Sequence, residues 1–194
     1  MTPDEMVRLG AERAEQGDSE GAERLFGAAA EAEHADAMNW YGVLLGKRGD
    51  ATGAEQWYRK AAAAGSVLGA YNVAFVLQQR RDDAGAEAWY RQAADGGDED
   101  AVVGLAFTLQ RLGRPDEAEG LHHRAARRGH VPSMIHYGRA MERQGDDGGA
   151  RVWYRRAADK GSCEAMVDLG CMLRARGDIA EAQIWFRTAS SKNS

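Results

Sequence analysis

The chain reads Trp57-Tyr58-Arg59-Lys60-Ala61-Ala62-Ala63-Ala64-Gly65, and this pattern returns at a constant spacing. The aromatic pair followed by arginine recurs 32, 96 and 128 residues later, at Trp89-Tyr90-Arg91, Trp153-Tyr154-Arg155 and Trp185-Phe186-Arg187. Alanine fills two columns with the same period of 32, namely Ala22, Ala54, Ala86, Ala118, Ala150 and Ala182, and Ala29, Ala61, Ala93, Ala125, Ala157 and Ala189. A period without gaps indicates an array of structural repeats.

Each repeat contains the pattern of two helices. Within residues 35–66, small or apolar residues recur at the spacing of one helical face, at Met38, Tyr41, Gly42 and Leu45. Gly49-Asp50 then ends this helix, and a second helix follows that ends at Gly65. A hairpin of two such helices cannot bury its apolar face alone, so the repeats are expected to stack. The tryptophans of one repeat column are expected to be buried between helices in equivalent places, at Trp57, Trp89 and Trp153.

The repeated residues resemble a known family. Tyr41-Gly42, Ala54, Tyr58 and Ala61 resemble the tetratricopeptide repeat, and the run from Trp57 to Gly65 looks more like its Sel-one-like branch. The resemblance implies an all-α fold, a right-handed superhelical solenoid of about six antiparallel helical hairpins with twelve helices. It also implies one domain, residues 1–194, with units at approximately 3–34, 35–66, 67–98, 99–130, 131–162 and 163–194.

Charge and composition exclude several classes of partner. The 194 residues include 25 basic and 30 acidic side chains, a net charge of −5, whereas binding to nucleic acid needs a basic surface. The longest apolar run, Val73 to Leu77, is far shorter than the roughly 20 residues that span a bilayer. We therefore expect neither a nucleic acid nor a membrane as partner. The two cysteines, Cys163 and Cys171, favour a reduced, cytoplasmic protein.

No pattern of residues indicates catalysis. Gly42 to Lys47 is the nearest match to a phosphate-binding loop, but its glycines are too close and no Ser or Thr follows the lysine. The five histidines lack the spacing of a metal site, and His122 fills an aromatic core column, so we expect a core histidine. We therefore expect a protein that is not an enzyme, with no catalytic residue, metal ligand or cofactor.

The aromatic residues outside the repeated columns indicate a candidate binding surface. Eleven of the 15 aromatic residues occupy repeat columns, and the remaining four lie on the first helices of the second to fourth units, at Trp40, Tyr71, Phe75 and Phe107. By resemblance, this face lines the concave groove where tetratricopeptide arrays bind peptides. Nearby columns add two amides and three cations, at Asn39, Asn72, Arg111, Arg139 and Arg143.

These residues predict a noncatalytic protein-interaction scaffold or adaptor that binds a peptide segment in the concave groove. Aromatic and arginine side chains are the usual anchors of such interfaces, so the partner should offer apolar anchors and acidic residues. Two alternatives stay open at this point. One is a self-assembling scaffold, a homo-oligomer through the uncapped C-terminal unit, and the other is a regulatory peptide or small-molecule sensor.

Overall fold

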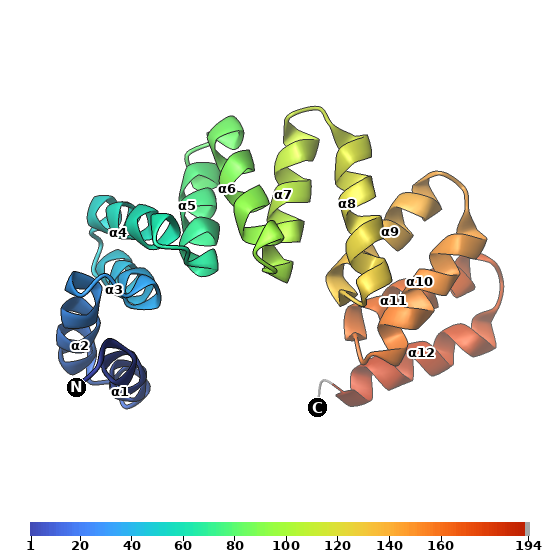
Figure 1. The fold of residues 1–194 in the computed structure, drawn as a ribbon. Coiled ribbons are helices and arrows are strands. Elements are labelled where there is room, and N and C mark those ends of the chain that lie inside the picture. The colour runs from blue at the N-terminus through green and yellow to red at the C-terminus, as the bar shows by residue number, and fades with distance from the viewer. Residues whose placement is uncertain (193–194) are drawn as a thin grey trace. The chain divides into compact units, whose positions relative to one another are not determined.

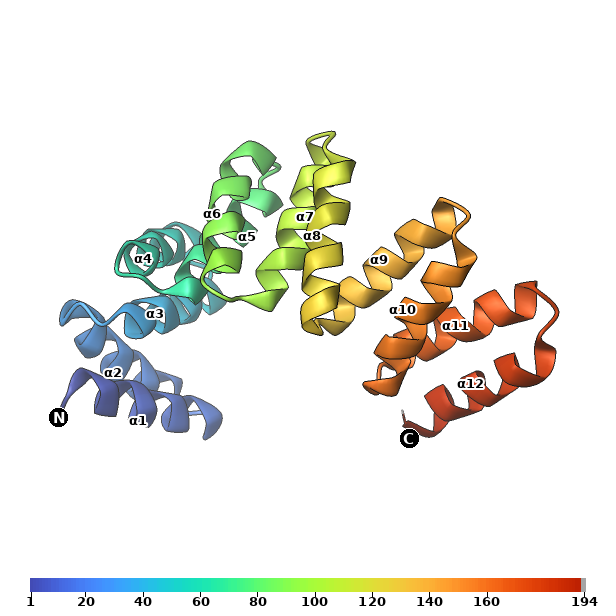
Figure 2. The same cartoon turned by 45° about the vertical axis from the view of Figure 1, so that its right-hand side comes forward.

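The computed structural model describes residues 1–192, and the last two residues of the sixth expected unit lie outside them. Within this part of the chain every regular element is an α-helix: α1 (Pro3–Glu15), α2 (Ser19–Glu31), α3 (Ala35–Lys47), α4 (Ala51–Ala63), α5 (Val67–Gln79), α6 (Asp83–Asp95), α7 (Glu99–Arg111), α8 (Pro115–Arg128), α9 (Val131–Arg143), α10 (Asp147–Asp159), α11 (Cys163–Ala175) and α12 (Ile179–Lys192). The twelve helices over residues 1–192 confirm the all-α expectation (Figures 1 and 2).

The helices fall into two compact bodies. The N-terminal body is residues 1–112, with α1 to α7, and the C-terminal body is residues 113–194, with α8 to α12. In both bodies the two helices of a hairpin pack on each other, for example α3 on α4 and α11 on α12. Each second helix also packs on the next first helix, as α4 does on α5 and α10 on α11. The apolar face of one hairpin is therefore buried by its neighbour.

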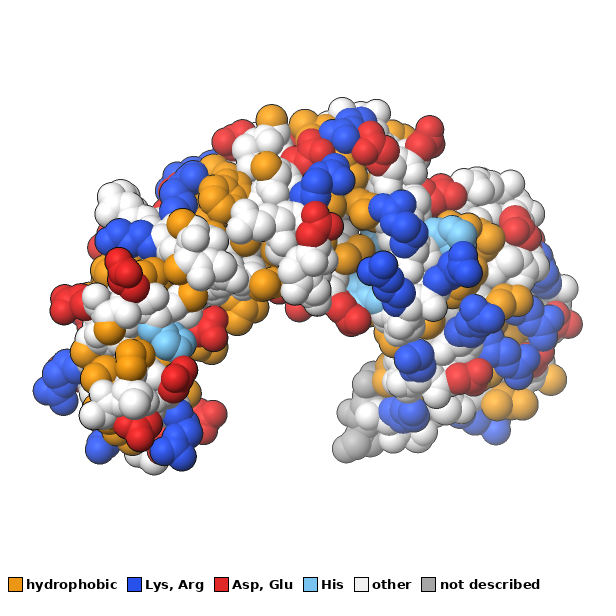
Figure 3. All heavy atoms as spheres, viewed as in Figure 1, with side chains coloured by type: hydrophobic (Ala, Val, Ile, Leu, Met, Phe, Trp, Pro, Cys, Tyr) orange, Lys and Arg blue, Asp and Glu red, His pale blue; other side chains and the backbone are white. Residues whose placement is uncertain are grey.

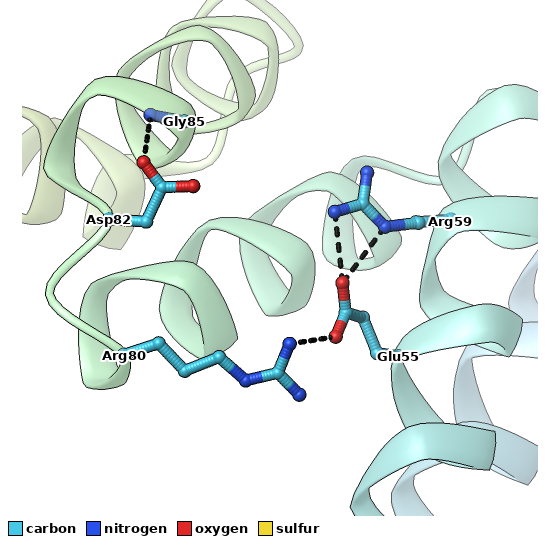
Figure 4. Close-up of polar contacts among 5 residues, drawn as sticks. All are labelled: Glu55, Arg59, Arg80, Asp82 and Gly85. Carbon is cyan, nitrogen blue, oxygen red and sulfur yellow. Dashed lines mark hydrogen bonds and ion pairs between the residues drawn. The ribbon is translucent and has the colours of Figure 1, made fainter.

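The second helix of most hairpins begins with the same local signal, an aspartate followed three residues later by glycine. The Asp82 carboxylate accepts a hydrogen bond from the Gly85 backbone N–H at 2.9 Å (Figure 4). Such a cap satisfies a backbone donor that has no partner within the helix. A β-carbon on Gly85 would clash with the carboxylate as it is placed here, whereas at α7 an aspartate cap, Asp98, accepts from an alanine, Ala101. The same bond occurs at Asp18–Gly21, Asp50–Gly53 and Asp146–Gly149.

Glycine ends most helices because the chain turns there with a positive φ. Gly49, for example, has φ of 89° and Gly65 has φ of 92°. Two repeats break this rule, because Glu33 with φ of 60° and Arg81 with φ of 64° adopt the same left-handed conformation with a side chain. Side chains disfavour this region, so these two positions store backbone strain.

In three hairpins the second aromatic of the pair is a buried tyrosine. Tyr58, Tyr90 and Tyr154 are buried, and a β-carbon on Gly42 would lie 2.8 Å from the ring of Tyr58. The expectation for the tryptophans is correct for Trp153, which is buried, and wrong for two others, Trp57 and Trp89, which are only partly buried. Neighbouring residues on a helix point about 100° apart, so when the tyrosine faces the centre of its hairpin the adjacent tryptophan points to one side, where its burial depends on the residues packed against it.

Ion pairs link successive repeats of the N-terminal body. Glu55 on α4 accepts hydrogen bonds from Arg59 of its own helix at 2.9 Å and from Arg80, at the end of α5, at 2.5 Å (Figure 4). Burial alone raises the pKa of Glu55, but the hydrogen bonds and charges of the two arginines outweigh it and lower the pKa below the usual value. Arg48 binds Glu23 in the preceding repeat at the same spacing of 25 residues. These pairs therefore connect each hairpin to the next.

Candidate protein-interaction surface

The first helices of the N-terminal body form a continuous row. α1 contacts α3, α3 contacts α5, and α5 contacts α7. Phe75 on α5 and Phe107 on α7 occupy the same repeat position and are 44% and 50% exposed. A large apolar side chain that stays exposed on two adjacent helices is the kind of surface that marks an interaction site. We call these two residues, with Trp40, the aromatic row.

On α3 the repeat position of Phe75 holds Val43, and an exposed aromatic, Trp40, lies about one turn earlier. Its side chain is 40% exposed, and its ring stacks on Phe26 of α2 with centroids 6.1 Å apart and planes 18° apart. One face of the indole is therefore held by the preceding hairpin. A ring that is already fixed loses little conformational freedom when a ligand covers its other face.

The amides and Tyr71 belong to the packing beneath the row. Asn39 is buried, at 2% exposure, and its side-chain oxygen accepts a hydrogen bond from Asn72 Nδ2 at 2.7 Å. A buried, bonded amide does not present itself to a ligand, so the structure removes Asn39 from the exposed surface. Tyr71 is partly buried and lies edge-on to Tyr90, with centroids 5.7 Å apart. Burial raises the pKa of Tyr71, and the charges of Asp100 and Asp98 raise it further.

Two of the three predicted cations already have partners within the chain. Arg111 binds Asp83 at 2.8 Å, and its guanidinium carbon lies 5.7 Å from the centroid of the Phe107 ring. In the C-terminal body, Arg139 binds Glu164 at 2.8 Å and Asp168 at 2.7 Å. Arg143 of the same body is exposed. The nine predicted residues therefore divide between the two bodies, with Arg139 and Arg143 in the C-terminal one.

The C-terminal body contains a histidine cluster in place of a buried tyrosine. His122 lies in the column of Tyr58, Tyr90 and Tyr154 and is buried, which confirms the expectation of a core histidine. Its Nδ1 lies 3.2 Å from Ser133 Oγ, and its ring stacks on His136 with centroids 4.7 Å apart.

Burial lowers the pKa of His122 to about 4, and the neighbouring His136 and His130 lower it too. Stacked rings direct their nitrogens along parallel planes rather than toward one ion. Over residues 1–192, no group of three or more His, Cys, Asp or Glu side chains is arranged to hold a metal.

A further cleft escaped the sequence analysis. A hollow of about 820 Å³ lies between α2 and α3, lined by Glu20, Glu23, Glu31, Tyr41 and Arg48 among others. Gly27 and Ala28, where the next repeat has Arg59 and Lys60, also line it. The size of these two residues is no signal for the cleft, because a hollow on α6 is lined by Arg91 and Gln92 at the same repeat positions. None of the nine predicted residues lines this cleft.

The hairpins, their repeat period and the exposed row define a helical-repeat protein of the solenoid class. The sequence profile of the tetratricopeptide repeat matches residues 7–67 and 104–162, more than half of the chain, and that of the Sel1 (Sel-one) repeat matches residues 69–98 and 163–194. The chain belongs to the tetratricopeptide-repeat family and carries Sel1-like repeats. Repeats of these families are generally protein–protein interaction modules and typically non-enzymatic.

Solved structures share the fold. The Sel1 repeat protein of Oxalobacter formigenes is 22% identical, with a TM-score of 0.81 over 98% of this chain and 88% of its own. The c5321 protein, a protective antigen of uropathogenic Escherichia coli, is 26% identical, with a TM-score of 0.76 over 95% of this chain and 45% of its own. The human IFIT1 dimer with PPP-AAAA is 16% identical, with a TM-score of 0.59 over 97% of this chain and 55% of its own. No curated protein sequence matches the chain. No helix within residues 1–192 has the length and apolar character to cross a membrane.

Proposed function

We propose that the protein is a noncatalytic scaffold or adaptor that binds a peptide segment of a protein partner along the aromatic row. The observation that carries the proposal is the exposure of Phe75 and Phe107 at one repeat position on adjacent helices. Aromatic side chains dominate the energetics of protein interfaces when a partner covers them. Trp40, stacked on Phe26, offers a third anchor on the next helix of the row.

In the N-terminal body no unpaired predicted arginine supports the expectation of an acidic partner. Arg111 is the predicted cation there, and Asp83 already neutralises it at 2.8 Å. Apolar anchors therefore carry the proposal. A protein partner is favoured over a nucleic acid because the net charge of the chain is −5, although IFIT1, which has a similar fold, was solved with PPP-AAAA. The two free cysteines, one of them exposed, support a reducing, cytoplasmic setting for this function.

A selection of random 12-residue peptides on the immobilised protein, followed by calorimetry of the enriched peptides, tests the proposal. The double variant Phe75→Ala with Phe107→Ala should bind at least about tenfold more weakly, since anchors of this kind contribute 2 kcal/mol or more. The matched control is Val152→Ala with Ile184→Ala, which also removes two exposed apolar side chains one repeat apart, on α10 and α12. Equal losses in the two double variants would contradict the proposal.

Self-association is the second candidate function, because Val152, Ile179 and Ile184 are exposed apolar residues on α10 and α12. Exposed apolar side chains of this kind promote contact between copies. Sedimentation velocity over a range of concentrations distinguishes the candidates. Assembly requires a mass that rises with concentration and falls again in an Ile184→Glu variant. A constant monomer mass would eliminate it.

A further inference from the structure

Because the two bodies share the same repeat, equivalent positions in them can be compared. Arg139 occupies in the fifth repeat the position that Phe75 occupies in the third, 64 residues earlier. Arg139 donates from Nη2 to Glu164 Oε1 at 2.8 Å, so this position faces a carboxylate of the following repeat. The residue equivalent to Glu164 in the repeat after Phe75 is Asp100. Asp100 therefore occupies, relative to Phe75, the position that Glu164 occupies relative to Arg139, but the Phe75 side chain has no charge to pair with it.

Asp100 is available for such a cation. It lies in the first turn of α7 and is exposed, and its charge raises the pKa of Tyr71, so it acts at short range on the helix that carries Phe75. Among residues 1–192 no ion pair involves Asp100, whereas its counterpart Glu164 binds Arg139. Glu99 beside it is also exposed.

The chain itself shows a cation against the neighbouring member of the aromatic row. The guanidinium of Arg111 lies 5.7 Å from the Phe107 ring centroid and is bound to Asp83. An aromatic face and a carboxylate together therefore hold an arginine at Phe107. Attraction of a guanidinium by a ring face increases when the pair is withdrawn from water.

The N-terminal body as a whole is negatively charged, like Asp100. Residues 1–112 carry 11 lysines and arginines against 19 aspartates and glutamates, a net charge of −8, whereas residues 113–194 carry 14 against 11, a net charge of +3. In Figure 3, Lys and Arg side chains gather over the visible face of the C-terminal body. A field of one sign steers a partner of the opposite sign toward the surface.

We propose that the peptide bound by the aromatic row is basic as well as apolar, with a Lys or Arg that lies against Phe75 and pairs with Asp100. The proposal rests on the function proposed above and specifies its partner. Apolar side chains of the same segment would cover Phe107 and Trp40. The sequence predicted an acidic partner, the opposite charge. Of the three arginines behind that prediction, Arg111 and Arg139 have partners within the chain, and Arg143 lies in the C-terminal body.

Three fluorescent peptides that share two Leu and two Phe residues, and that differ only in carrying four Lys, four Ser or four Glu, test the inference by fluorescence anisotropy. The lysine peptide should bind at least about tenfold more tightly than the glutamate peptide at low salt, and its advantage should shrink as salt screens the charges. Asp100→Asn should weaken the lysine peptide about threefold or more and leave the serine peptide unchanged. Asp95→Asn is the matched control, since it removes an equal charge from an exposed site at the end of α6.

The outcomes separate the two proposals. Tighter binding of the glutamate peptide, still lost in Phe75→Ala with Phe107→Ala, would overturn the basic partner and leave the peptide-binding function standing. Equal effects of Asp95→Asn and Asp100→Asn would overturn the pairing at Asp100. If none of the peptides binds, or if the double phenylalanine variant binds them unchanged, both proposals fail. Circular dichroism melting of each variant shows that it is folded.

Discussion

Arg81 shows how a single residue departs from the repeat that surrounds it. Glycine occupies its column at Gly17, Gly49, Gly113, Gly145 and Gly177, all with positive φ, whereas Arg81 adopts φ of 64° with a full side chain. We expect Arg81→Gly to stabilise the protein by about 1 kcal/mol. The left-handed conformation costs a residue with a β-carbon roughly 1–2 kcal/mol, and glycine removes this cost. The greater conformational freedom of glycine in the unfolded chain offsets part of the gain. Urea unfolding measures the change. Gly49→Ala is the converse control and should destabilise by a similar amount.

His122 makes the stability of the C-terminal body depend on pH. Its folded pKa is about 4, lowered by burial, against 6.5 in the unfolded chain, so the folded state favours the neutral ring. The resulting stability is present above pH 6.5 and is lost as pH falls toward 4, by about 3 kcal/mol. His136, whose pKa is also lowered, adds in the same direction.

Denaturant midpoints between pH 4 and 7 measure this loss for the native chain and for His122→Tyr. Tyrosine is the residue found at this position in three other repeats, at Tyr58, Tyr90 and Tyr154. The variant should lose much less stability on acidification. An identical pH profile for the two proteins would show that His122 does not titrate with unfolding.

At the scale of the helix, adjacent aromatics of one repeat have different roles. Tyr90 is 1% exposed and its hydroxyl donates to Gln78 Oε1 at 3.1 Å, while the neighbouring Trp89 is partly buried under Arg59 of the preceding repeat. We expect Tyr90→Ala to destabilise by about 3–5 kcal/mol, as for other large buried aromatics, and Trp89→Ala by clearly less. Urea unfolding followed by circular dichroism compares them. A larger loss for Trp89→Ala would show that the tryptophan is the main contact between hairpins.

Helix positions were predictable from the sequence because each signal occurs several times. The period of 32 places two helices in every repeat, and the aspartate and glycine columns set where they begin and end. The direction of a particular side chain was less predictable. Trp57 and Trp153 share a column, yet only Trp153 is buried, enclosed by His123 and Tyr137, whereas Trp57 is partly buried.

At the scale of the whole molecule, the exposed aromatic residues could be predicted and their polar neighbours could not. Subtracting repeat columns identified Phe75 and Phe107, because an aromatic outside the repeated core has no conserved place inside a hairpin. The partners of Arg111 and Arg139 lie 28 and 25 or 29 residues away, on other hairpins. A pattern read along one helix does not contain these contacts. That the six units form a single domain stays a prediction.

Photo-crosslinking tests the central claim, that peptides bind along the first helices of residues 1–112, most directly. Benzoyl-phenylalanine at position 75 or 107 replaces an exposed aromatic with a reactive one, and position 152 on α10 serves as the control of similar exposure. With the lysine-containing peptide bound, irradiation should give crosslinked product at positions 75 and 107 and little at 152. Product at 152 with none at 75 or 107 would contradict the account.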